Sequence, residues 1–271
     1  IKKQVNHLIN EINRSKWVND KMIGCASIIL SGLAYKDKKY LNYGLNLLKQ
    51  IINFSFDAQN FPKSRNFRQL IFYLKYFILI REWLKESQNE IPEYLNEIVF
   101  FLGQNYNFIW QNTNQTLLFN GNHLNSNTNF DKYLNFHNYK FKNESNEIGG
   151  YAILKNKNFI LSVDLGSSPQ KKFSNDYQSG ALSFEIFFNN CKLISNCGYF
   201  QNYKHQLNSI SKSTVTHSTV VLDSRSSCKM KKDTDGIFKT DEELKILKKS
   251  IIFEKKYWKI SGSHDGYLKK Y

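Results

Sequence analysis

The stretch that decides the fold is ALSFEIFFNNCKLISNCG, residues 181–198. An apolar run rich in aromatic residues, ALSFEIFF, and a second run, CKLISNCG, flank an Asn-Asn pair, and this pattern predicts a β-hairpin. Residues 149–166 repeat the pattern, because YAILK and FILSVDLG flank the polar turn NKN. Further strands are expected in STVTHSTVVLD, residues 213–223, and in KSIIFEKKYWKISGSHDGY, residues 249–267. Closely spaced strands without intervening helices predict an antiparallel β-sandwich over residues 149–271.

The first part of the chain has a different period. Its apolar residues recur at helical spacing, and residues 67–84 and a segment that starts at Ile91 predict two long helices. Pro92 suits the first turn of the second helix, where the missing N–H has no partner to lose. Short polar connections between such helices favour antiparallel neighbours. Two amphipathic stripes support this interpretation: Val5, Leu8, Ile9 and Ile12, and then Leu41, Leu45, Leu48 and Ile52.

A polar, Asn-rich stretch without a period separates the two patterns and predicts loops over residues 111–145. We therefore expect an α+β multidomain chain, with a helical domain over residues 1–125, a linker over 126–148 and an antiparallel β-sandwich over 149–271. The first residue is Ile1, and the last residues, HDGYLKKY, are typical of the middle of a hairpin. We accordingly expect the sequence to be a piece of a longer protein, truncated at both ends.

Composition narrows the classes of partner. The 271 residues carry 38 Lys and Arg against 23 Asp and Glu, which gives a net charge of +15. This excess suits a polyanionic partner, but the basic residues are spread along the chain and also fit the Lys-rich composition of an AT-rich genome. The longest apolar run, residues 70–80, is interrupted by Lys75 and is too short to span a membrane. Four cysteines without a CxxC pair predict neither a zinc knuckle nor a disulfide framework.

Four phrases of the β half, taken in order, resemble the heparinase II/III-like family. They are GGYAILKNKNFILSVDLGSSP (residues 149–169), ALSFEIFFNNCKLISNCG (181–198), STVTHSTVVLD (213–223) and SGSHDGY (261–267). In the helical half, WVNDKMIGCASIILSGLAY and DAQNFPKSRN resemble the last helical hairpins of the family's α/α toroid. The resemblance covers nearly the whole chain. It implies the C-terminal part of that toroid, followed by the family's β-sandwich.

The resemblance also implies a function. Characterised members of the family are lyases that cleave uronic-acid-containing polysaccharides, such as glycosaminoglycans or alginate, by β-elimination in a cleft between the domains. This chemistry requires a group that neutralises the substrate carboxylate, a base that takes the C5 proton and an acid that protonates the leaving oxygen. No cofactor is required for these steps. Such lyases usually work outside the cytoplasm, so the resemblance implies the cell envelope or periplasm.

Candidate catalytic residues follow from the same resemblance. His217 matches the signature His of the family's Ser-Thr-x-x-His strand, and Arg65 matches the Arg of the toroid loop, whose planar fork suits a carboxylate. Asn19 loosely matches a polar cleft residue, and its alternative role is a helix N-cap. Tyr199, in the Gly-Tyr corner, would either supply a phenol near the cleft or only pack there. For His217 and Arg65 the alternatives are a packed interface histidine and a surface arginine.

A metal site is the second expectation that comes from the family. Some members hold a structural zinc in the sandwich, and His217 and His264 would be ligands if they were cross-strand neighbours. Asp223 would lie roughly 20 Å from His217 along a regular strand, which makes it a poor third ligand.

The sequence departs from the lyases at two places. Their toroid loop continues with a Tyr that acts as acid or base, whereas this chain has Gln69 there and Tyr73 one helical turn later. Ahead of LSFE the lyases often carry His-Ala-Asp, where residues 178–180 are Gln-Ser-Gly. Two functions therefore stay open: a lyase acting on an acidic polysaccharide, and a non-catalytic polysaccharide-binding protein of the cell envelope on the same scaffold. We expect no nucleic-acid partner and no membrane insertion, and the sequence leaves the oligomeric state open.

Overall fold

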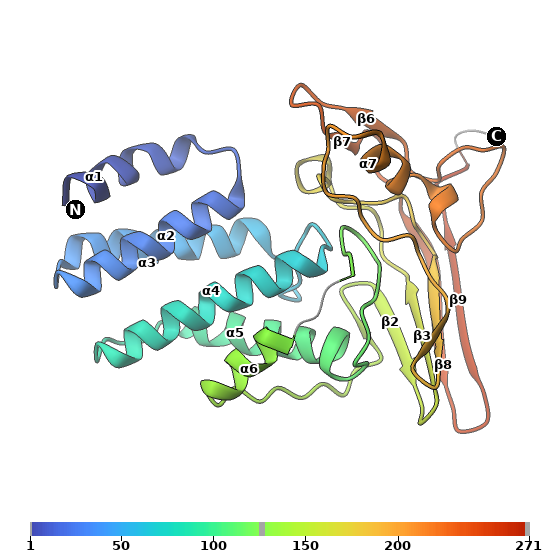
Figure 1. Cartoon of the computed structure of the whole chain (residues 1–271), viewed down its shortest axis with the longest axis horizontal. Coiled ribbons are helices and arrows are strands. Elements are labelled where there is room, and N and C mark those ends of the chain that lie inside the picture. Colours follow the sequence, from blue (N-terminus) through green and yellow to red (C-terminus); the bar gives the residue numbers. More distant parts are fainter. Residues whose placement is uncertain (1, 125–127, 269–271) are drawn as a thin grey trace. The chain divides into compact units, whose positions relative to one another are not determined.

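The computed structural model describes residues 2–124 and 128–268. These residues divide into two compact units, one made of residues 2–60 and 70–103 and the other of residues 61–69 and 104–268. Every residue described in the first unit belongs to helices and their connections, whereas the described strands belong to the second unit (Figure 1). The predicted combination of a helical part and an antiparallel sheet is confirmed.

The first unit is built from antiparallel helices. In chain order they are α1 (Lys2–Glu11), α2 (Val18–Ala34), α3 (Lys38–Ser55), α4 (Phe67–Glu86) and α5 (Glu93–Tyr106), of which α4 and α5 extend beyond the unit's bounds. Figure 1 shows α2 and α3 side by side. Gly32 allows this approach, because a Cβ there would lie 2.6 Å from the backbone nitrogen of Leu41. Among the described residues, no helix is long and apolar enough to cross a membrane.

The second unit also contains helical segments, η2 (Asn107–Gln111) and α6 (Thr128–Phe136). The prediction of loops for this Asn-rich stretch is wrong for α6. Phe130 and Leu134 lie one helical turn apart and are both buried, and the ring of Phe130 packs edge-on against Tyr106 at 5.0 Å. Two apolar residues at this spacing are sufficient to bury one face of a short helix even when the rest is polar.

A five-stranded antiparallel sheet in the order β1–β2–β3–β4–β5 forms the centre of the second unit. Its strands are β1 (Glu147–Ile148), β2 (Tyr151–Lys155), β3 (Phe159–Asp164), β4 (Phe184–Phe188) and β5 (Cys191–Ile194). Both predicted hairpins are confirmed. In the second hairpin, Asn189 and Asn190 have positive φ angles of 47° and 64°, as the two-residue turn between β4 and β5 requires.

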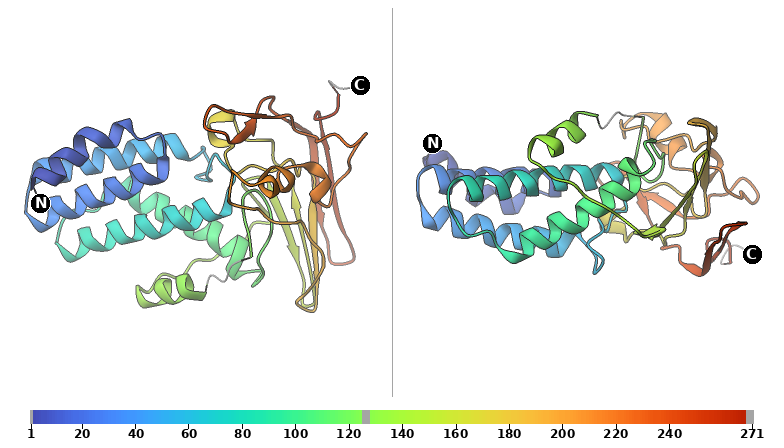
Figure 2. Two further views of the ribbon diagram at one scale, coloured as in Figure 1. Left: turned by 45° about the horizontal axis from the view of Figure 1, so that its top comes forward. Right: turned by 90° about the horizontal axis from the view of Figure 1, so that it is seen from below.

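Two further hairpins complete the second unit. They consist of β6 (Met230–Lys232) with β7 (Phe238–Thr240), and β8 (Ile246–Phe253) with β9 (Trp258–His264). Ile251 of β8 and Ile260 of β9 pack against a buried cluster of Ala152, Val163 and Leu165. The β8–β9 hairpin therefore covers the five-stranded sheet, which Figure 2 shows from two further sides. This packing is the predicted sandwich.

The predicted strand over residues 213–223 is wrong. This segment forms a 3-10 turn over Thr214–Thr216 after the short helix α7 (Gln206–Ser211), and then continues as irregular chain. The hydroxyl of Thr214 donates to the carbonyl of Ser179 at 2.6 Å, and the hydroxyl of Ser218 donates to the carbonyl of Phe184. Because Ser and Thr side chains bond the backbone here, they replace the ladder that a β-branched strand would form.

Candidate functional site

Arg65 lies in the loop before α4, and its side chain is buried within the second unit. Its Nη2 donates to the Oδ1 of Asp164 at 2.7 Å and to the carbonyl of Gly150 at 3.3 Å. Nε donates to the carbonyl of Gly149 at 3.2 Å, and Nη1 donates to that of Ser167 at 3.3 Å. These bonds use four of the five N–H groups of the guanidinium. The carboxylate that Arg65 binds is thus part of the protein, and a substrate carboxylate would have to break this pair.

Asp164 is the centre of this buried polar network. It is 1% exposed. Besides Arg65, its carboxylate accepts hydrogen bonds from the side chain of Asn120 at 2.9 Å and from the backbone N–H of Gly166 at 3.0 Å. The hydroxyl of Tyr151 donates to the carbonyl of Arg65 at 2.8 Å, and its ring lies 4.4 Å from the guanidinium. The network therefore fixes the Arg65 loop on strands β2 and β3.

A second arginine, Arg68, has the environment of a binding group. Its side chain is 27% exposed, and its Nη2 lies 3.4 Å from the Oδ2 of Asp176. The guanidinium lies 5.4 Å from the ring of Tyr199, and within the described chain its Nε has no hydrogen-bond partner. Asn66 positions this side chain, because its amide oxygen accepts from the N–H of Arg68 at 2.8 Å while its Nδ2 donates to Asp176 at 2.7 Å. Asn66 thereby also caps α4.

Tyr199 and His123 complete this group, which we call the Arg68 cluster: Arg68, Asp176, Tyr199 and His123. Burial, and then the charge of Asp176, raise the pKa of Tyr199 well above its ordinary value, so that the phenol stays protonated at physiological pH. Burial, and then the charge of Arg68, lower the pKa of His123, which favours a neutral imidazole. The cluster thus groups a partly exposed cation, a protonated phenol that is 7% exposed and a neutral imidazole within one unit.

Gln178 connects the Arg68 cluster to neighbouring loops. Its Oε1 accepts from the N–H of Gly121 at 3.0 Å. Its Nε2 donates to the carbonyl of Gly198, which precedes Tyr199, at 2.9 Å and to the carbonyl of Ser211 at 2.6 Å. All of these atoms are buried, so one side chain joins three separate loops. From the sequence, this position was identified only as one where the chain differs from the lyases, and its role in joining the loops was not predicted.

His217 is 9% exposed and forms the C-terminal cap of the 3-10 turn instead of lying in a strand. Burial lowers its pKa to about 4, against the opposing effects of a hydrogen bond to the backbone of Ser211 and the charge of Asp164. The imidazole is therefore neutral at physiological pH. Its Nε2 is buried and has no hydrogen-bond partner among the described residues. An unpaired buried atom of this kind costs about 1–3 kcal/mol, and such atoms in native structures often mark a functional group or an ordered water.

The predicted zinc ligands do not come together as expected. His264 lies in β9, but its cross-strand partner is Ile246, and His217 is not in a strand. The Nδ1 of His264 accepts from the N–H of Gly266 at 3.0 Å. No group of three or more His, Cys, Asp or Glu residues in the described ranges could hold a metal ion. The described residues therefore do not fit the family's zinc.

Three other residues singled out from the sequence have different environments. Asn19 is exposed and is the second residue of α2, whose N-cap is Trp17, so the N-cap interpretation of Asn19 is wrong. Tyr73 is 1% exposed, and burial raises its pKa to about 12, against the opposing effect of its hydrogen bond with Ser55. Gln69 accepts a hydrogen bond from the hydroxyl of Ser64 at 2.6 Å. Neither Tyr73 nor Gln69 supplies the acid or base that the lyases carry after their Arg.

Sequence reasoning missed Arg68, Asp176 and Asn120, and it found no partners for His123. A signal existed for Arg68, because an Asn directly before an apolar helical run predicts an N-cap and places the next residues at a helix start. A weaker signal existed for Asn120, which stands in the polar turn phrase FNGN. Asp176 lies in an irregular segment without any pattern, and only the fold brings it to Arg68.

Comparison with known proteins agrees with this architecture. Residues 144–271 match the family model described as Heparinase II/III-like, C-terminal. Over these residues the chain is similar to that family. The resemblance inferred from the four phrases is thereby confirmed for the β half, which contains Tyr199, Asp176 and His217. No curated protein sequence matches the chain.

Solved structures similar to this chain include heparinase III, with a TM-score of 0.69 and 14% identity over 92% of this chain. The heparan sulfate lyase HepC from Pedobacter heparinus gives a TM-score of 0.64 and 13% identity over 88% of this chain. These likenesses show the fold, including its helical part. The chain spans 44% of the heparinase III chain and 43% of the HepC chain. The heparinase II/III-like domain and the helices before it thus correspond to less than half of these proteins.

Proposed function

We propose that the protein to which this chain belongs is a polysaccharide lyase that cleaves an acidic, uronic-acid-containing polysaccharide by β-elimination. The observation that carries the proposal is the Arg68 cluster inside a heparinase II/III-like domain. A partly exposed guanidinium beside a protonated phenol is the pair of groups that a carboxylated sugar with a leaving oxygen requires. The heparan sulfate lyases that share the fold act on a polysaccharide of this class.

The groups divide the chemistry as follows. The guanidinium of Arg68 neutralises the uronate carboxylate, which makes the C5 proton more acidic. The phenol of Tyr199 donates a proton to the leaving glycosidic oxygen. The base is a neutral imidazole, and the two candidates are His217, which matches the family's signature His, and His123. The Nε2 of His217 is covered in this structure, whereas His123 is partly exposed and lies in the field of Arg68.

The alternative is a non-catalytic polysaccharide-binding protein on the same scaffold. Two observations favour it: Arg65, the residue matched to the lyases, is already paired with Asp164, and Gln69 replaces the following Tyr. A binding protein would still use Arg68 as the cation for the carboxylate. We place either form in the cell envelope or periplasm, since this is where lyases of this family usually work. The inter-domain cleft predicted from the sequence stays a prediction.

The full-length protein, incubated with a panel of heparan sulfate, other glycosaminoglycans and alginate, distinguishes the two functions. A lyase produces an unsaturated sugar, which is followed by its ultraviolet absorbance. Arg68→Gln and Tyr199→Phe should each lower the rate about 10²-fold or more. Lys63→Gln, a charge loss in the same loop, is the matched control and should leave the rate within about twofold.

The two imidazoles are separated in the same assay by His123→Gln and His217→Gln, with folding checked by circular dichroism. The base is the histidine whose loss abolishes turnover while substrate binding is retained. If no substrate is cleaved but one binds in an Arg68-dependent manner, the lyase proposal fails and the binding protein is supported.

A further inference from the structure

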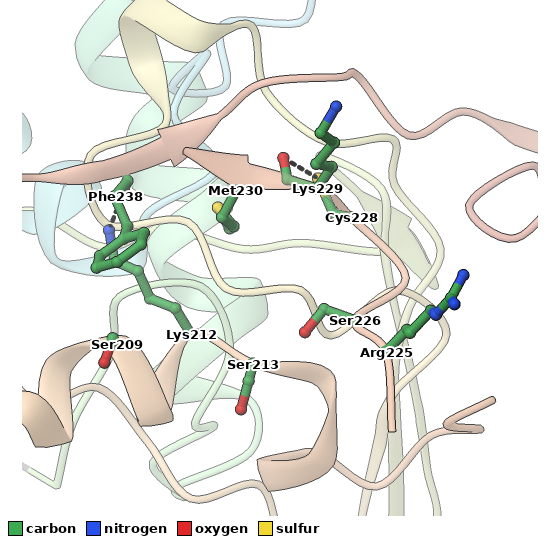
Figure 3. Close-up of a pocket in the computed structure, with 9 residues that line it drawn as sticks. All are labelled: Ser209, Lys212, Ser213, Arg225, Ser226, Cys228, Lys229, Met230 and Phe238. Carbon is green, nitrogen blue, oxygen red and sulfur yellow. Dashed lines mark hydrogen bonds between the residues drawn. The ribbon is translucent and has the colours of Figure 1, made fainter. Parts of the chain in front are cut away.

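A pocket of about 350 Å³ lies apart from His217 and the Arg68 cluster, within the second unit. It is formed by the end of α7, the segment after it, the segment before β6 and the start of β7. Figure 3 shows its lining residues as sticks, with Phe238 and Arg225 at opposite sides. Its volume is at the low end for small-molecule sites, which suits a ligand no larger than a few rings.

The floor of the pocket is apolar. It is formed by Met230, the ring of Phe238, Cys228 and the methylene chain of Lys212. Phe238 is half-buried, so part of its ring faces the pocket. An aromatic face next to aliphatic groups provides the dry contact on which the C–H face of a sugar ring packs.

The rim of the pocket carries hydroxyls and cations. Ser209, Ser213 and Ser226 line it together with Arg225 and Lys229. None of the described residues that line the pocket is acidic, but Lys229 is paired with Glu242 at 2.8 Å and with Asp241 at 3.5 Å, so we assign the anionic group of a ligand to Arg225. Hydroxyls are donors and acceptors that match those of a saccharide, and an arginine fork binds a sulfate or carboxylate through two parallel hydrogen bonds.

Lys212 adds a fixed positive charge in the wall. It is 2% exposed, and its Nζ donates to the carbonyls of Asn175 and Phe238, neither of which carries a charge. Burial lowers its pKa to about 8, so the ammonium is still mostly protonated at neutral pH. The charge of Asp176 offsets part of the cost of burying this cation, and an anionic group bound at the pocket would offset more of it.

From this lining we propose that the pocket binds one sugar unit that carries a sulfate or a carboxylate, as a subsite separate from the Arg68 cluster. The sugar ring packs on Phe238 and Met230, its hydroxyls bond the serines, and its anionic group reaches Arg225 at the mouth. The inference rests on the proposed function for the choice of an acidic polysaccharide. It is connected to that site through Lys212, whose Nζ also lies 5.8 Å from the ring of Tyr199.

Binding of size-defined oligosaccharides to the protein, measured by calorimetry, tests the subsite. The probes are a heparan sulfate oligosaccharide, an unsulfated alginate oligosaccharide and inorganic sulfate. Ser209→Phe fills the pocket, and Gln206→Phe, on the exposed side of the same helix, is its control. Arg225→Gln removes the cation at the mouth, and Lys204→Gln, an exposed lysine outside the pocket, is the matched charge loss.

Arg225→Gln should weaken binding of one oligosaccharide about tenfold or more, because it removes a charge-assisted hydrogen bond. Ser209→Phe should weaken it as much, because the ring fills the pocket. Both controls should bind within about twofold of the parent protein. The subsite is overturned if Ser209→Phe and Arg225→Gln bind like their controls, or if sulfate alone binds as tightly as the oligosaccharide. The exposed position of Arg225 keeps the test valid even if Ser209→Phe fails to fold.

The cleavage assay, run on the same variants, separates this inference from the proposed function. Binding that depends on Ser209 and Arg225 without any cleavage supports the subsite and contradicts the lyase. Cleavage that depends on Arg68, together with binding that Ser209→Phe leaves unchanged, supports the lyase and overturns the subsite.

Discussion

Replacing Asp164 by Asn should destabilise the second unit severely. Three donors converge on this buried carboxylate: Arg65 at 2.7 Å, Asn120 at 2.9 Å and the N–H of Gly166 at 3.0 Å. An asparagine has one oxygen and one NH₂ group, so in either orientation its NH₂ group faces a donor. It also leaves the charge of Arg65 buried and unpaired, and breaking a buried ion pair in this way costs about 3–5 kcal/mol. That is a large part of the total stability of a typical domain, about 5–15 kcal/mol.

Urea denaturation of the parent protein and of Asp164→Asn, followed by near-ultraviolet circular dichroism, measures this loss. Asp176→Asn is the matched control, because its pair with Arg68 is longer, at 3.4 Å, and partly exposed. The amide oxygen of the asparagine can still accept the bond from Asn66, so the substitution should cost about 0–1 kcal/mol. In an Arg65→Met background, Asp164→Asn should cost clearly less, since the unpaired charge is then absent. Equal losses for Asp164→Asn and Asp176→Asn would refute the assignment of Arg65 and Asp164 as the structural pair.

Three further predictions concern single positions. In urea denaturation, Gly121→Ala should lower the free energy of unfolding more than Gly236→Ala. Both glycines have φ near +80°, where an alanine costs about 1–3 kcal/mol, but a Cβ at Gly121 would also lie 2.6 Å from the Nδ2 of Asn66, whereas at Gly236 the nearest atom is 3.7 Å away. Equal losses of stability would contradict the contact with Asn66. The pKa of His217 is about 4 in the folded protein and about 6.5 in the unfolded chain, so its contribution of about 3 kcal/mol to stability is present above pH 6.5 and lost as the pH falls towards 4. The free energy of unfolding should therefore fall less between pH 7 and pH 4.5 in His217→Gln than in the parent protein, and an equal fall would mean that His217 is not buried in its neutral form. Glu185→Gln should lower the free energy of unfolding by about 1–3 kcal/mol in thermal denaturation, because the carboxylate of Glu185 accepts from the backbone N–H groups of two separate loops. A loss below about 0.5 kcal/mol would show that other contacts hold these loops.

The strands and helices with a clear period could be predicted from the sequence. The runs YAILK and FILSVD form β2 and β3 as expected, because their apolar residues bury against the sheet's core. The same reasoning failed for residues 213–223, which are richer in β-branched residues than these two strands. There the Ser and Thr hydroxyls have backbone carbonyls within reach, at Ser179 and Phe184, and these partners come from distant segments. Propensity does not contain that information.

The candidate site could be predicted only in part, and the two arginines show why. Arg65 and Arg68 are three residues apart, and the sequence chose Arg65 from its match to the family. Arg65 has a left-handed φ of 57° and is turned into the network around Asp164. Arg68 lies in the first turn of α4 and remains 27% exposed. The φ angle of Arg65 and the carboxylate of Asp164, 99 residues away, determine which of the two arginines faces solvent. Neither can be predicted from the residues around the arginines.

The chain around residue 211 links the Arg68 cluster, His217 and the proposed sugar subsite, which determines how their variants must be interpreted. The carbonyl of Ser211 accepts from Gln178, which fixes the corner before Tyr199, and it also bonds His217. The next residue, Lys212, forms the wall of the proposed sugar subsite. A substitution that displaces this backbone would therefore alter the phenol, the imidazole and the subsite together. Substitutions of side chains that do not displace this backbone, such as Arg68 and Arg225, can separate catalysis from binding. The experiments that test the two proposals therefore use these two positions.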